Sequence, residues 1–198
     1  MDEKLDKRLE RLKQRLEKQS FQENEGLSNE VGYYIFDYQP QNELEIREYL
    51  KELQTSPLAR RINLKVFDIF DIMVSEIEKI QKLTSSDPFD IIAQMEKTGG
   101  LTLVTQQINN LLKMSENNNA IVQYIQERIK DEERCVIFIT GVGKVYPILR
   151  AHKILNTMHQ IIDEYPVVMF YPGNYDELSL QAFGEVKDQN YYRAFRID

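Results

Sequence analysis

The sequence predicts an α/β fold with three layers: a mainly parallel, five-stranded sheet with helices on both faces. Short runs of aromatic and β-branched residues alternate along the chain with longer segments of helical periodicity, which is typical of parallel sheets. Two of these runs, residues 134–140 and 166–171, are almost entirely apolar, as strands covered on both faces are. These two features together favour the α/β class.

Five segments are expected to be strands. The first is aromatic and ends before Pro40, and the second alternates apolar with polar residues. The last alternates aromatic and basic residues, so about half of its side chains are expected to fill the core. The expected strands cover residues 32–38, 62–70, 134–140, 166–171 and 191–197.

The segments between the strands are expected to be helices. Asp87 and Pro88 form a helix start, with an N-cap residue followed by proline at the first helical position. Three helical stretches follow one another between the second and third strands, which predicts a helical insertion there. A turn is expected at Pro172-Gly173. The expected helices cover residues 42–53, 71–82, 88–97, 101–114, 119–131, 145–162 and 178–184.

Residues 1–19 form an amphipathic helix with a leucine on every turn. Seven basic and five acidic residues in 1–18 give this segment a charge of +2. A helix this short is marginal alone, so it packs on its own domain, pairs with a copy of itself or docks on another protein. We expect a detachable contact helix, followed by a linker at 20–30 and one domain at 31–198. The candidate contact residues of the helix are Leu5, Leu9, Leu12 and Leu16.

Composition limits the function. The 198 residues carry a net charge of −7, which disfavours binding to DNA by charge alone. No run approaches the ~20 apolar residues of a membrane span, and the charged N-terminus does not resemble a secretory signal. The single cysteine, Cys135, allows no intrachain disulfide and agrees with a cytoplasmic location. Weak DNA contact remains an alternative, through Lys144, Arg150, His152 and Lys153.

Three positions follow the third expected strand in the pattern of a phosphate-binding loop: Gly141, Gly143 and Lys144. The complete motif is absent, because Phe138 and Val145 stand where a Walker A loop needs glycine and Ser or Thr. A tight strand-to-helix turn is therefore favoured over an anion site.

Carboxylates at the ends of the first two strands offer an alternative site. Asp37, Asp68 and Asp71 lie where sites form in parallel sheets, and they could hold Mg²⁺. They could equally cap turns or face solvent. His152, His159 and Asp163 share a helix face but lack the further ligand that zinc needs, so no metal or other cofactor is expected. Cys135 lies within an expected buried strand, where a thiol is inert.

The C-terminal third combines tyrosine with arginine, two residue types that anchor protein interfaces. The alternative is that about half of these aromatic residues fill the core. The candidate contact residues are Tyr146, Pro147, Arg150, His152, Pro172, Gly173, Tyr175, Asp176, Tyr191, Tyr192 and Arg193.

Several segments resemble the BrxB family of the bacterial BREX (bacteriophage exclusion) systems. At the N-terminal side the likeness covers Tyr34–Pro40 with Glu43, Leu44 and Arg47. At the C-terminal side it covers Val136–Pro147, Arg150–His152 with Leu155 and Asn156, Pro166–Asp176 and Asn190–Ile197. The motifs are specific when taken together, and the resemblance spans about residues 30–198.

The resemblance implies a small subunit that works beside a large ATPase, an adenine-specific DNA methyltransferase and a PglZ-type phosphatase-like protein. It implies no catalytic residue. We therefore expect a non-catalytic adaptor that docks the PglZ-type protein in an anti-phage complex. A metal- or nucleotide-dependent hydrolase using the strand-end carboxylates is the alternative, as is a weakly DNA-binding subunit.

Overall fold

The computed structural model describes residues 3–24, 32–83, 87–176, 180–182, 186–187 and 194–197. The chain divides into two compact units. The sheet unit comprises residues 1–67, 131–140 and 162–198, and the helical unit comprises residues 68–130 and 141–161. Of the expected linker at 20–30, residues 25–30 lie outside the described residues, whereas Gln19–Gln22 form a short helix in which Phe21 is buried.

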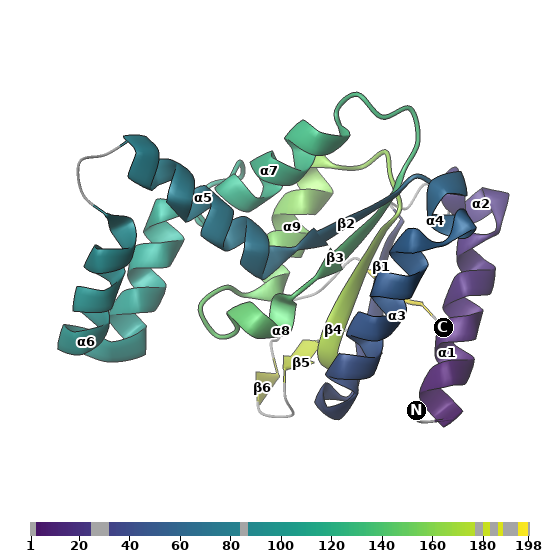
Figure 1. Cartoon of the computed structure of the whole chain (residues 1–198), viewed down its shortest axis with the longest axis horizontal. Helices are drawn as coiled ribbons and strands as arrows, with labels where there is room; N and C mark the ends of the chain where they lie inside the picture. Colours follow the sequence, from purple (N-terminus) through teal and green to yellow (C-terminus); the bar gives the residue numbers. More distant parts are fainter. Residues whose placement is uncertain are drawn as a thin grey trace. The chain divides into compact units, whose positions relative to one another are not determined.

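The sheet has the strand order β2-β3-β4-β1-β7; β5 pairs with β4, and β6 pairs with β5 (Figure 1). β1 pairs in parallel with β4 from Tyr33 opposite Val167 to Tyr38 opposite Pro172, and it also pairs in parallel with β7. β3 and β4 are parallel as well. The predicted α/β class with a mainly parallel five-stranded sheet is confirmed. The strands are β1 (Tyr33–Tyr38), β2 (Leu64–Asp68), β3 (Val136–Thr140), β4 (Val167–Tyr175), β5 (Leu180–Ala182), β6 (Val186–Lys187) and β7 (Phe195–Arg196).

One cluster of core residues in the sheet unit lies on one face of this sheet. Aromatic side chains of neighbouring strands pack there in tilted pairs, with the ring centroids of Phe36 and Phe170 5.3 Å apart and those of Phe138 and Phe170 5.0 Å apart. Helices cover this face with their own apolar residues. Strand residues of the opposite face, such as Ile35 and Met169, are also fully buried. The helices of this unit are α1 (Glu3–Leu16), α2 (Gln19–Gln22), the short 3₁₀ helix η1 (Pro40–Asn42), α3 (Glu43–Thr55) and α4 (Pro57–Arg61).

The N-terminal helix α1 belongs to this core, beside α3 (Figure 1). Its four leucines are buried, with 4, 4, 0 and 0 % of Leu5, Leu9, Leu12 and Leu16 exposed. The prediction that these leucines contact a partner is therefore wrong. An apolar stripe on a helix must be covered, and here the sheet face needs the same cover. The guanidinium carbon of Arg15 also lies 4.8 Å from the ring centroid of Tyr34.

The helical unit contains the predicted insertion between β2 and β3. Asp87 caps α6 as expected, since its Oδ1 accepts a hydrogen bond of 2.8 Å from the Phe89 amide. Gly100 has φ of 60° and ψ of −156°, so α6 is two arms joined by a kink, as the sequence predicts. The helices are α5 (Ile69–Leu83), α6 (Pro88–Leu111), α7 (Ala120–Ile129), α8 (Val142–Val145) and α9 (Ala151–Ile161).

Several predicted boundaries are wrong. The expected helix over 145–162 is interrupted between α8 and α9, because Pro147 has no amide hydrogen to continue it. β4 runs through the expected turn at Pro172-Gly173, where Gly173 pairs with Ala182 of β5. Residues 180–182 form that strand and not a helix, and β2 ends at Asp68 rather than at residue 70. No described helix is long and apolar enough to span a membrane.

Candidate interaction site

Residues 146–152 form a partly exposed segment between α8 and the first turn of α9, in which Arg150 is the exposed residue; we call it the Tyr–Arg segment. Arg150 is exposed, and its guanidinium carbon lies 5.4 Å from the centroid of the Tyr146 ring. Pro147 and His152 are half-buried. This segment presents tyrosine and arginine together, the two residue types predicted to make contact with a partner.

The backbone of the Tyr–Arg segment is fixed from inside the helical unit. Leu149 is 1 % exposed and donates its amide hydrogen to the Val145 carbonyl at 2.9 Å. The side-chain nitrogen of Asn109 donates to the Ile148 carbonyl at 2.8 Å and to the Thr105 carbonyl at 2.7 Å. A segment held in this way loses little conformational entropy on binding. Sequence reasoning missed Asn109, because nothing local indicates that it reaches a carbonyl 39 residues away.

Asp37, an alternative catalytic carboxylate, is part of a buried ion-pair network in the sheet unit. It is 2 % exposed at the end of β1. Its oxygens accept hydrogen bonds from Arg8 at 2.9 Å, from the Tyr175 amide at 3.0 Å and from Nε of Arg196 at 3.1 Å. These donors satisfy a carboxylate that would otherwise be costly to bury. Asp37 thus ties α1, β4 and β7 to β1.

Tyr175 lies in the same network and not on the surface. It is 2 % exposed, and its hydroxyl donates to the Ala194 carbonyl at 2.6 Å. Pro172 and Gly173 are also buried, within β4. Their predicted role as contact residues is therefore wrong, because the strand continues through them. Asp176 follows β4 and is exposed.

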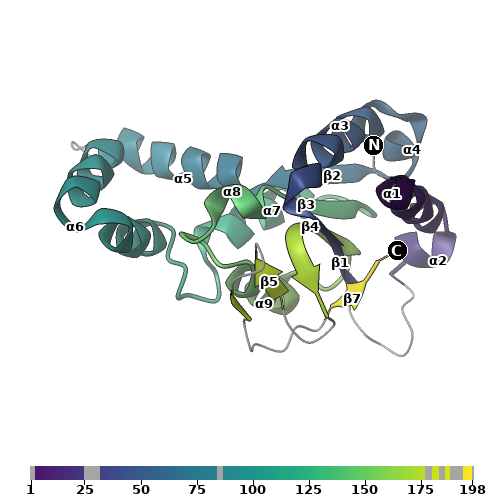
Figure 2. The ribbon, with the colours of Figure 1, turned by 90° about the horizontal axis from the view of Figure 1, so that it is seen from below.

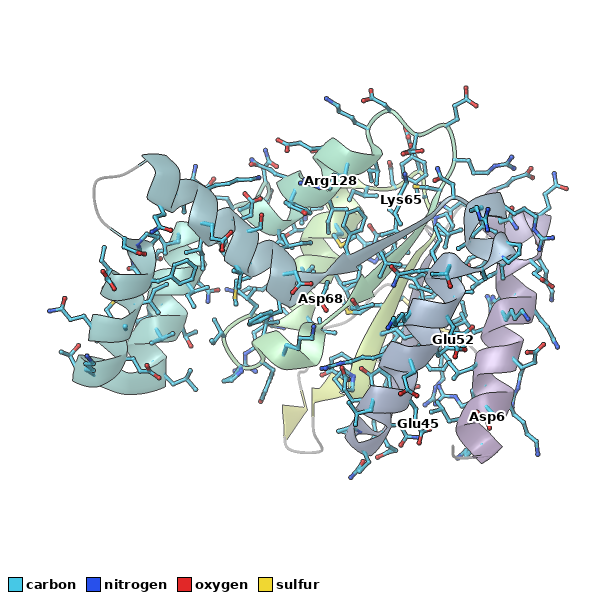
Figure 3. All side chains as sticks on the ribbon, in the orientation of Figure 1. Asp6, Glu45, Glu52, Lys65, Asp68 and Arg128 are labelled. Carbon is cyan, nitrogen blue, oxygen red and sulfur yellow. The ribbon has the colours of Figure 1, made fainter. Side chains whose placement is uncertain are left out.

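Asp68 and Lys144 form an ion pair of 2.6 Å in the helical unit. Oδ1 of Asp68 also accepts hydrogen bonds from the amides of Phe70 at 3.0 Å and Asp71 at 3.4 Å, so it caps α5 (Figure 3). A Cβ at Gly141, where φ is 73°, would lie 2.2 Å from that oxygen. A carboxylate against the loop repels an anion, which favours the tight-turn interpretation of Gly141, Gly143 and Lys144.

The three aspartates do not form the alternative metal site. Among the described residues, no group of three or more His, Cys, Asp or Glu side chains is placed to hold a metal ion. Asp37 belongs to the sheet unit, whereas Asp68 and Asp71 belong to the helical unit. The predicted cluster is therefore wrong. Asp37 and Asp68 lie at the ends of β1 and β2 and Asp71 lies in the first turn of α5. Asp37 serves as an ion-pair partner, and Asp68 serves as a helix cap.

Three predicted contact residues cannot be placed. Tyr191, Tyr192 and Arg193 lie outside the described residues. The described members of the predicted contact set that are exposed or half-buried are Tyr146, Pro147, Arg150, His152 and Asp176.

Comparison with known proteins supplies the family. Residues 65–197 match the model of the family described as "BREX protein BrxB". The chain belongs to the BrxB family. A BREX protein BrxB of Bacillus cereus (strain H3081.97) is 38% identical over 195 residues, which cover 98% of this chain and 97% of the relative. A BREX protein BrxB of Escherichia coli O9:H4 (strain HS) is 30% identical over 197 residues, covering 100% and 93%.

Both BrxB relatives match the chain almost from end to end, so α1 lies within the matched length. The BrxB family model covers the helical unit from Asp68 onward, including the Tyr–Arg segment. No solved structure matches this BrxB chain.

Proposed function

We propose that this BrxB-family chain is a non-catalytic adaptor of a BREX anti-phage complex that acts in the cytoplasm. Its Tyr–Arg segment docks a PglZ-type phosphatase-like protein, and the large ATPase and the methyltransferase are further possible members of the complex. Membership of the BrxB family supports the BREX assignment. The docking role rests on the residues of the chain.

The observation that carries the proposal is the presentation of Tyr146 and Arg150 by a fixed backbone. The cation and the ring lie 5.4 Å apart, and the buried Leu149 and the Asn109 side chain hold the segment between them. Interfaces draw most of their binding energy from a few such Tyr and Arg side chains. Because the segment is ordered before binding, less of that energy is lost on association.

The polar groups near strand ends have structural partners, which supports a role without catalysis. Asp37 is fully satisfied by two arginines and a backbone amide, and Asp68 caps α5 while it pairs with Lys144. A catalytic acid or base has to be within hydrogen-bond reach of a substrate proton. The oxygens of these two carboxylates already accept hydrogen bonds from residues of the chain itself.

The experiment measures binding of the separately purified PglZ-type protein to matched arginine variants. We expect Arg150→Ala to weaken binding about tenfold or more, the loss of a hot-spot side chain. The control is Arg128→Ala in α7 (Figure 3), which removes a second pair of an arginine over a tyrosine ring in the same unit. The guanidinium carbon of Arg128 lies 3.3 Å from the centroid of the Tyr124 ring. Arg128→Ala should bind like the wild type.

Two results would contradict the docking proposal. One is equal binding by the Arg150→Ala variant and the wild type. The other is equal weakening by Arg150→Ala and Arg128→Ala, because it would indicate a general loss of stability or charge and not a specific contact. Circular dichroism of each variant separates misfolding from lost contact, since Arg150 is exposed and its removal should leave the fold intact.

A further inference from the structure

The 28 residues from 135 to 162 contain no acidic side chain, although the chain has 32 aspartates and glutamates. This acid-free stretch has three basic residues and both histidines of the chain, so its charge is +3 with the histidines neutral. The total of −7 therefore leaves −10 on the other 170 residues. Charge is thus separated along the chain, and the basic part includes the Tyr–Arg segment.

Helix α9 presents exposed polar side chains of this stretch on one face. It packs beside α7 in the helical unit (Figure 1, Figure 2) and buries Ile154, Leu155 and Met158. Helix residues three or four positions apart share a face. Exposed residues at these spacings form the side of α9 opposite to the buried one; we call it the α9 face. Its members are Arg150, which directly precedes the helix, and Lys153, Asn156 and Gln160.

Every side chain of the α9 face donates hydrogen bonds, and none carries a negative charge. Within the described part of the chain, Arg150 and Lys153 form no ion pair. In contrast, Lys144 of the same stretch lies 2.6 Å from a carboxylate oxygen of Asp68, and the exposed Arg47 pairs with a glutamate one helical turn away. The α9 face therefore offers two neighbouring cations to which none of the described residues supplies a carboxylate.

The stability of α9 does not account for these cations. A helix is stabilised by acidic residues in its first turn, and α3, α5 and α6 have Glu43, Asp71 and Asp90 there. The first turn of α9 contains no acidic residue. Arg150 and Lys153 lie at this end of the helix and repel each other at a spacing of three residues. Both effects disfavour the pair in the isolated chain, and a carboxylate bound between the two side chains would remove both.

The number of cations indicates which kind of anion the α9 face takes. Duplex DNA is held through several phosphate contacts, about six to ten in strongly salt-dependent complexes, and the −10 elsewhere on this chain repels an extended polyanion. A short acidic segment of a protein needs to meet only the α9 face. Two α9 faces would oppose like charges, and a contact with an acidic surface of a second copy would join unlike surfaces and leave one α9 face open.

We propose that the α9 face binds an acidic segment of the protein that docks on the Tyr–Arg segment, with Arg150 and Lys153 paired to its carboxylates. The planar guanidinium group matches a carboxylate through two parallel hydrogen bonds, and the lysine adds a point charge beside it. This inference rests on the proposed docking role and adds the chemistry of the partner surface.

The first test treats the complex, purified from cells that express the complete BREX gene set, with a carbodiimide. This reagent joins a lysine amine to a carboxylate that touches it, so mass spectrometry of the product identifies both residues. We expect Lys153 to be joined to an aspartate or glutamate of the PglZ-type protein. The control is Lys97 of α6, an exposed lysine of the same unit, which should form no such link.

The second test measures binding of the purified PglZ-type protein to charge variants of the full chain. Lys153→Glu should weaken binding about tenfold or more, because a carboxylate would then face carboxylates. Lys153→Arg keeps the charge and should bind much more tightly than Lys153→Glu. Lys97→Glu changes the net charge by the same amount and should bind like the wild type. Lys153→Glu adds an acidic residue to the first turn of α9, so lost binding would not reflect a weakened helix.

The inference would be overturned by a Lys153 that forms no link, by equal binding of Lys153→Glu and the wild type, or by equal weakening in Lys97→Glu. A link from Lys153 to a second copy, or duplex DNA binding that Lys153→Glu abolishes, would assign the α9 face to that occupant and reject the acidic partner. A link to carboxylates of a different BREX protein would keep the acidic partner and contradict only the docking of the PglZ-type protein.

Discussion

At the scale of single residues, Asp37 joins parts of the chain that are far apart in sequence. Its partners Arg8, Tyr175 and Arg196 are 29, 138 and 159 residues away. The carboxylate is 3 % exposed and the Arg8 side chain 14 %, so both charges are largely removed from water. A pair of this kind is tolerated because each charge is satisfied by the other.

Removing the Asp37 carboxylate should therefore be costly. We expect Asp37→Ala to lower the free energy of unfolding by about 3–5 kcal/mol, because the Arg8 guanidinium is left buried without this acceptor. Urea unfolding measures the change. The control is Asp6→Ala, an exposed carboxylate of α1 (Figure 3), for which a change within about 0.5 kcal/mol is expected. Equal effects of the two substitutions would contradict the structural role of Asp37.

Cys135 should be unreactive in the folded protein. Burial, and to a smaller extent the neighbouring Glu132, raise the pKa of its thiol to about 12. At about pH 8 only about one thiol in ten thousand is then ionised, and the thiolate is the reactive form. Labelling with DTNB should be negligible for the native protein and complete in urea. Rapid stoichiometric labelling without denaturant would show that β3 is open to solvent.

The sequence predicts the position of side chains such as Asp37 along a strand, but not the role that they have in the folded protein. The position of Asp37 at the end of a strand is predictable from the sequence pattern, and both a catalytic and a structural interpretation are compatible with it. The choice depends on Arg8 and Arg196, which reach Asp37 only through tertiary folding. The prediction that Tyr175 contacts a partner is wrong for the same reason. Its hydroxyl donates to the carbonyl of Ala194, 19 residues further along the chain, which the local sequence does not indicate.

At the scale of secondary-structure elements, α1 completes the sheet unit instead of detaching from it. Leu12 and Leu16 are fully buried against the face that carries Phe36 and Phe138. Leu12→Ala should lower the free energy of unfolding by about 2–5 kcal/mol, the usual cost of emptying a core leucine site. Urea unfolding gives the value.

A matched control is Leu44→Ala, since Leu44 is 70 % exposed and its truncation removes almost no contact. We expect a change within about 0.5 kcal/mol for it. Deletion of residues 1–19 should likewise destabilise the sheet unit severely. A truncated chain as stable as the full chain would restore the detachable-helix interpretation.

The kink of α6 depends on Gly100. Its φ of 60° and ψ of −156° lie in a region that only glycine adopts readily, although a Cβ there would meet nothing within 4 Å. We expect Gly100→Ala to cost about 1–3 kcal/mol through the backbone alone. Thr98→Ala, an exposed neighbour in the first arm, should be close to neutral. Equal stability of Gly100→Ala and the wild type would place the kink elsewhere.

Element types were predictable where local chemistry decides them. Asp87 with Pro88 marks the start of α6, and the Gly99-Gly100 pair separates its arms. The apolar stripe of α1 was equally predictable from the sequence. The surface that covers this stripe was not, because any apolar surface of complementary shape can cover it. β5 was missed because residues 180–182 become a strand only by pairing with the extended end of β4.

At the scale of the whole molecule, the strand order β2-β3-β4-β1-β7 places the first strand between two strands from the C-terminal third. No local pattern encodes such an order, since long-range pairing determines it. The sheet unit is therefore built from both ends of the chain, and the helical unit from the middle. The Tyr–Arg segment is on the helical unit, in the connection between β3 and β4 and outside the insertion between β2 and β3.

The central claim is that this chain works by holding a partner. It is tested most directly by purifying the tagged chain from cells that express the complete BREX gene set and measuring the composition of the complex. We predict that the PglZ-type protein is recovered in fixed stoichiometry with the wild type and is lost with Arg150→Ala but not with Arg128→Ala. Recovery of the wild-type chain alone, with both proteins present at micromolar concentration, would contradict the account.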